Sequence, residues 1–91
     1  MRGKAGQIDE GIEVAFEVRL AADRVQAARF QAFGCPHTIA VAAYVAEQAI
    51  GHEASGLPES VPQLAVRFEV PPEKLGRLLA IEDAWLAALR R

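Results

Sequence analysis

A cysteine and a histidine lie two residues apart in the segment Gly34-Cys35-Pro36-His37. Thiolate and imidazole are both good metal ligands, and the thiolate is the nucleophilic form of cysteine. Pro36 suits the first turn of a helix, because its missing N–H would have no partner there. The segment therefore predicts that Cys35 lies at a strand-to-helix junction, where the N–H groups of the helix lower its pKa.

Several interpretations of this pair are open. One chain offers only two ligands, but two copies related by a twofold axis would supply two sulfurs and two nitrogens in a homodimer. Alternatively, Cys35 is a small buried apolar residue and His37 faces solvent. Catalysis with Cys35 as nucleophile and His37 as base needs a third orienting group and a pocket that the sequence does not supply. We therefore expect that this chain is not an enzyme.

Other polar residues give weaker signals. Asp9 and Glu10 could bind a hard cation through oxygen, although a solvated acidic segment is the simpler interpretation. His52 has no companion in its loop, and we expect it to be inert.

Composition narrows the classes of function. The chain has 91 residues, 52% of them hydrophobic and 24% charged, which suits one domain over residues 1–91. A net charge of -2 lacks the positive field that favours nucleic acid. The single cysteine cannot form an internal disulfide, and the longest apolar stretch, residues 38–46, is too short to span a membrane. We expect a cytoplasmic, bacterial-type protein without nucleic-acid or membrane partners.

The elements that must position the pair follow from periodicity. Residues 12–20 alternate between apolar and polar side chains, which predicts a half-buried strand. Residues 21–24 suit a hairpin connection, and residues 25–33 predict a second, antiparallel strand anchored by Phe30 and Phe33. We expect residues 1–11 to be a flexible N-terminus.

Helices account for most of the remaining chain. The pattern predicts a helix over 36–50 that ends at Gly51, a short helical piece over 63–68, and a last helix from about Pro72. The last helix has a predicted inward stripe of Leu75, Leu78, Leu79, Trp85, Leu86 and Leu89. The expected fold class is α+β, a small antiparallel sheet with helices packed on one face.

Two segments carry a resemblance to a known family. Residues 28–35, ending in Phe33-Gly34-Cys35, are similar to the strand and aromatic-Gly-Cys turn of the IscU/NifU N-terminal-type iron–sulfur cluster assembly scaffolds. Residues 71–84 are similar without gaps to that family's Pro-Pro-x-Lys, His-Cys and Glu-Asp-Ala stretch. The chain thus resembles a shortened, ligand-poor member of this family.

The resemblance implies an iron–sulfur cluster or iron as cofactor, with Cys35 as a ligand. The family's first cysteine falls near residues 9–12, where no cysteine exists, and its His-Cys pair falls on Gly76 and Arg77. Because a cluster needs several thiolates, we expect a degenerate scaffold or a chain that binds no cofactor.

The resemblance also implies partners. The stretch Val70-Pro71-Pro72-Glu73-Lys74 is similar to the segment that a dedicated Hsp70-type chaperone recognises, although it could simply be a helix-entry turn. A cysteine desulfurase is the other implied partner. The alternative function is a paralogue without a cluster that docks on the desulfurase or chaperone as a regulatory protein.

Overall fold

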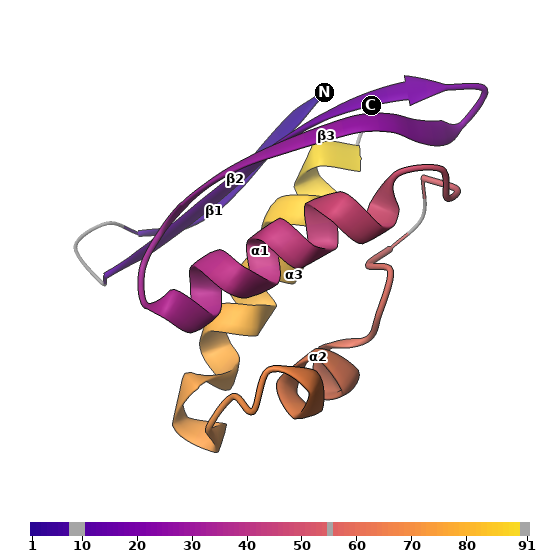
Figure 1. Cartoon of the computed structure of the whole chain (residues 1–91). Helices are drawn as coiled ribbons and strands as arrows, with labels where there is room; N and C mark the ends of the chain where they lie inside the picture. The colour runs from indigo at the N-terminus through magenta and orange to yellow at the C-terminus, as the bar shows by residue number, and fades with distance from the viewer. Residues whose placement is uncertain (8–10, 55, 90–91) are drawn as a thin grey trace.

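The computed structural model describes residues 1–7, 11–54 and 56–89 of the chain (Figure 1). Three strands form one antiparallel sheet in the order β1-β2-β3, with bounds β1 Arg2–Gln7, β2 Ile12–Ala21 and β3 Arg24–Phe33. The helical elements are α1 Pro36–Ala49, α2 Val61–Arg67, the 3-10 turn η2 Pro72–Lys74 and α3 Leu75–Leu89. Helices α1 and α3 cross one face of the sheet (Figure 1), which confirms the α+β prediction.

Strand β1 differs from the expected flexible N-terminus. It pairs with β2 from Arg2 opposite Glu17 to Gln7 opposite Ile12. Its other support is α3, whose backbone comes so close to Gly3 that a Cβ there would lie 2.1 Å from the Ala88 nitrogen. The prediction was wrong for residues 2–7 because contacts distant in sequence, which leave no local pattern, hold this strand; residues 8–10 lie outside the described residues.

The predicted hairpin is confirmed, with one irregularity. Ala22 and Asp23 take φ angles of 51° and 63°, as the central residues of a type I′ turn do. Beyond the turn, Val25 lies opposite Leu20 while Ala27 lies opposite Arg19, so that β3 contains a β-bulge at position 26.

The alternation of side chains along β3 places Phe33 on the face of the sheet away from the core. Ala28, Phe30 and Ala32 pack against the core, whereas Phe33 falls on the opposite face and is 55% exposed. The expectation that Phe33 anchors the strand was therefore wrong, and that for Phe30 was right.

Trp85 of α3 lies at the centre of the core. Its ring meets Phe16 of β2 edge-to-face with centroids 5.1 Å apart, a favourable aromatic geometry. Its indole Nε1 donates a hydrogen bond to the Gly56 carbonyl at 2.8 Å, so the buried N–H has a partner. Trp85 thus joins the sheet to the loop between α1 and α2.

The buried side of α3 is offset from the predicted stripe. The buried residues of α3 are Leu78, Ile81, Ala84, Trp85 and Ala88, so Leu78 and Trp85 of the predicted stripe are buried as expected. Leu75, Leu79 and Leu86 are 38%, 50% and 37% exposed, contrary to expectation. The physical reason is the close approach to Gly3, which requires small side chains such as Ala84 and Ala88 on the sheet side of the helix.

Helix α1 follows the prediction closely. It begins at Pro36, and Gly51 with φ of 87° follows its C-terminal end. Neither α1 nor any other helix in the described parts of the chain is long and apolar enough to cross a membrane.

Candidate functional site

Cys35 occupies the junction that the sequence predicts. Strand β3 ends at Phe33, and Cys35 is the residue directly before the first helical residue of α1. Its backbone is extended, with φ of -75° and ψ of 166°, and its carbonyl accepts a hydrogen bond from the Ile39 N–H at 3.3 Å. The side chain is half-buried, so the thiol is shielded from bulk water without being closed off from it.

The surroundings of the Cys35 sulfur favour the thiolate. Its Sγ lies 3.5 Å from Oγ1 of Thr38, a residue that is fully buried. Burial raises the pKa of Cys35, but the Thr38 hydroxyl, the backbone N–H groups of Thr38 and His37, and the His37 side chain outweigh it and lower the pKa to about 6. A thiol with this pKa is mostly ionised at neutral pH.

His37 is brought next to Cys35, as the sequence suggests. Its side chain contributes to the lowered pKa of Cys35. The residue is half-buried, and its Nδ1 is shielded from solvent and has no hydrogen-bond partner among the described residues. The pair is therefore a thiolate with an imidazole beside it rather than a histidine that faces solvent.

Gly11 and Arg77 lie in the two segments where the resemblance places the missing ligands, and both are at the end of the molecule that holds Cys35. The register of β2 and β3 places Glu13 opposite Phe33, so the start of β2 adjoins the strand that leads to Cys35. Arg77 of α3 reaches this region, and its Nη1 donates a hydrogen bond to the Gly11 carbonyl at 3.4 Å. Gly76 has open space around it, and Asp9 and Glu10 lie outside the described residues.

These groups do not make a complete cluster site in one chain. Among residues 1–7, 11–54 and 56–89, no three His, Cys, Asp or Glu side chains gather as metal ligands do. The chain has one cysteine, and Arg77 stands where the resemblance implies the cysteine of the family's His-Cys pair. Since a cluster is held by several thiolates, a single copy does not fit one.

The second predicted site is a turn that leads into α3. Val70 is buried, with 9% of its surface exposed, and Pro71 precedes η2 with the Lys74 N–H donating to its carbonyl at 2.9 Å. Pro72 and Glu73 are exposed. A partner could therefore contact the tip of this turn, but could reach Val70 only if the turn opened.

His52 lies in the turn after α1, away from the thiol. Its side chain is exposed, and its backbone carbonyl accepts a hydrogen bond from the Val25 N–H at 2.9 Å. Its observed contacts are those of a structural loop residue.

The sequence reasoning missed a polar cluster between α1 and α2. The Tyr44 hydroxyl donates to the Glu59 carboxylate, and Arg67 lies 2.8 Å from the same carboxylate and 5.2 Å from the Tyr44 ring centroid. Arg67 and then Tyr44 lower the pKa of Glu59, and the hydrogen bond to Glu59 raises the pKa of Tyr44. Periodicity treats Tyr44 as a core residue, and no local signal connects it to Glu59.

Thr38 was missed for a different reason. A threonine in the first turn of a helix is an ordinary residue, and only its distance from the Cys35 sulfur reveals its effect on the thiol. The spacing of three residues from Cys35 is the one signal that could have identified it, because such residues are neighbours in a helical turn.

Comparison with known families supports the resemblance. Residues 1–84 match the family model of the NifU-like N terminal domain, and the chain therefore belongs to that family. A comparison with curated proteins finds no match.

Proposed function

We propose that this member of the NifU-like N-terminal family acts in iron–sulfur cluster assembly as a degenerate scaffold, with Cys35 as its one reactive thiol. The family is one of iron–sulfur cluster assembly scaffolds. The observation that supports a retained role is the setting of Cys35, whose pKa is lowered to about 6 beside Thr38 and His37. A cysteine that only filled space would not need these polar neighbours.

In this proposal a single copy holds no complete cluster. Two copies would bring two Cys35 sulfurs and two His37 nitrogens to one iron ion or cluster, the cargo of the protein. The protein is not itself an enzyme in this role. It receives sulfur with the help of a cysteine desulfurase and works with an Hsp70-type chaperone in the cytoplasm.

A second candidate function has its own supporting observation. Arg77 places a cation at a ligand position and bonds to Gly11 near another one. This contact favours a paralogue that has given up cluster binding and docks on the desulfurase or the chaperone as a regulatory protein.

Anaerobic reconstitution with iron and sulfide separates the two candidates. The scaffold proposal expects a visible absorption band, iron and acid-labile sulfide in the protein, and a dimeric mass in solution. Cys35→Ser should abolish all three, and His37→Ala should weaken them. His52→Ala is the matched control, because it removes an exposed imidazole away from the thiol and should change nothing.

The remaining outcomes are equally informative. A colourless protein that still binds a cysteine desulfurase in a calorimetric titration supports the regulatory candidate. A colourless protein that binds neither desulfurase nor chaperone contradicts both candidates. A band that survives Cys35→Ser contradicts the assigned role of the thiol.

A further inference from the structure

The sheet has an open face that the helices do not cover. Helices α1 and α3 pack on the other side (Figure 1), and the charged residues on the open side come from all three strands. They are four cations and two carboxylates, namely Arg2, Lys4, Arg19, Arg29, Glu13 and Glu17. We call these six residues, together with Phe33, the open sheet face.

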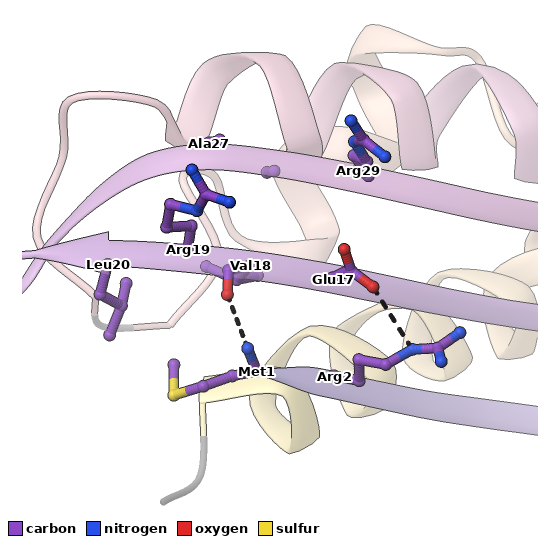
Figure 2. A pocket seen from close by; sticks show the side chains of 9 residues that line it. Met1, Arg2, Glu17, Val18, Arg19, Leu20, Ala27 and Arg29 are labelled. Atoms are coloured by element: carbon purple, nitrogen blue, oxygen red, sulfur yellow. Dashed lines mark hydrogen bonds and ion pairs between the residues drawn. The ribbon is translucent and has the colours of Figure 1, made fainter.

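Two of the four cations on this face are already paired. Arg2 lies 3.7 Å from the Glu17 carboxylate, and Lys4 lies 3.8 Å from that of Glu13. Arg19 and Arg29 are exposed and make neither a hydrogen bond nor an ion pair with any described residue. Figure 2 shows both arginines near Glu17, whose carboxylate makes its ion pair with Arg2. All four residues line one surface pocket.

The charge of this face is opposite to that of the rest of the molecule. Outside the open sheet face the chain carries ten Asp and Glu side chains and six Lys and Arg side chains. The open sheet face carries two carboxylates and four cations, although the whole chain has a net charge of -2. Such segregation creates a local positive field that an acidic surface would complement.

Phe33 adds an apolar contact to the same face. It lies opposite Glu13 in the register and is 55% exposed at the end of β3. Exposed aromatic residues and arginines together are typical of protein interfaces, where aromatic side chains bury large areas and arginines select the partner.

We propose that the open sheet face docks a protein partner through an acidic, partly apolar segment that pairs with Arg19 and Arg29 and contacts Phe33. A protein fits better than nucleic acid, because Glu13 and Glu17 stand among the cations and would repel closely spaced phosphates. The same two carboxylates oppose adsorption to an anionic membrane. This docking does not depend on the chemistry of Cys35.

The test uses a fluorescein-labelled peptide of alternating glutamate and leucine, with the full chain as titrant and anisotropy as readout. We expect saturable binding that weakens as salt increases. Arg19→Gln combined with Arg29→Gln should weaken binding about fivefold, since each exposed ion pair contributes modestly. Phe33→Ser should weaken it as well.

The matched control is Gln48→Glu combined with Val66→Glu, which changes the net charge by the same two units as the double glutamine variant. Gln48 of α1 and Val66 of α2 are exposed on the helical side, so this variant should bind the peptide as the wild type does. Cys35→Ser should also bind normally, which distinguishes this proposal from the proposed function. Circular dichroism of each variant checks that the fold is intact.

Specific results would overturn the proposal. They are absence of peptide binding, equal weakening of binding in the Gln48→Glu and Val66→Glu control, and unchanged binding by the double glutamine variant. Tighter binding of a single-stranded oligonucleotide or of phosphatidylserine vesicles, lost in the double glutamine variant, would assign the face to nucleic acid or membrane instead.

Discussion

The lowered pKa of Cys35 predicts how its reactivity depends on pH. With a pKa of about 6, about nine-tenths of the thiol is ionised at pH 7, against about 3% for an ordinary cysteine of pKa about 8.5. The thiolate population is thus about 30-fold higher. A less basic thiolate is also a weaker nucleophile: with a Brønsted coefficient of about 0.4 to 0.5, the rate constant of the thiolate falls about 10- to 18-fold, which cancels much of this gain.

The pH midpoint is therefore a better test than the rate at one pH. We expect the rate of alkylation by iodoacetamide to rise with pH and level off with a midpoint near 6. The absorbance of the thiolate in the ultraviolet should give the same midpoint. A midpoint at or above about 8.5 would refute the inference that the junction stabilises a thiolate.

Substitutions test the cause of the shift. Thr38→Val keeps the shape of a buried side chain but removes the hydroxyl, the largest of the groups that lower the Cys35 pKa, so the midpoint should move up. His37→Ala should move it less, because the His37 side chain contributes less than the hydroxyl. His52→Ala should leave the midpoint in place. An unchanged midpoint in Thr38→Val would show that the hydroxyl is not the cause.

The same shift links stability to pH. Because the folded-state pKa is lower than that of the unfolded chain, the unfolded state binds more protons between about pH 6 and pH 8.5. The stabilising contribution of the thiolate is therefore fully present above this window and is lost as the pH falls through about 6. Urea denaturation of the wild type and of Cys35→Ala across this window should show that the difference between their free energies of unfolding becomes smaller towards low pH.

Three other changes have defined outcomes. Gly3→Ala should destabilise the protein by about 3 kcal/mol in urea denaturation, because its Cβ would overlap the α3 backbone, whereas Gly76→Ala meets open space and should not destabilise it. Glu59→Gln should speed hydrogen exchange in α2, since it weakens the contacts with Arg67 and Tyr44, and equal exchange rates would contradict this. Gly76→His with Arg77→Cys should increase the iron and acid-labile sulfide retained after reconstitution, and no increase would show that further ligands are needed.

The predictable part of the fold is the part with periodic burial. The strict alternation of β2 identifies its buried face, where Val14, Phe16 and Val18 are at most 2% exposed. The segment that forms β1 has no β-branched or aromatic residue, so its sequence gives no strand signal. It becomes a strand because the neighbouring β2 offers it hydrogen bonds and because α3, at the other end of the sequence, packs on Gly3.

The exposed leucines of α3 illustrate a second limit. Large apolar residues suggest the inward side of a helix, but Ala84 and Ala88 face the sheet here because the backbones come close together. A sequence shows which residues are apolar, whereas the distance between two elements decides which of those residues fit between them.

The candidate site also has features that the sequence predicts and features that only the structure shows. The position of Cys35 follows from Pro36, but its ionisation depends on the Thr38 hydroxyl, whose distance from the sulfur only the structure shows. The ligand-poor character is visible in the sequence as the absence of cysteines, yet the structure adds that Arg77 spans from α3 to Gly11. A hydrogen-bonded guanidinium thus stands where the resemblance implies a ligand. Completing a ligand set within one chain would require replacing Arg77 as well as adding thiols, so Arg77→Ala alone should not increase the iron retained after reconstitution.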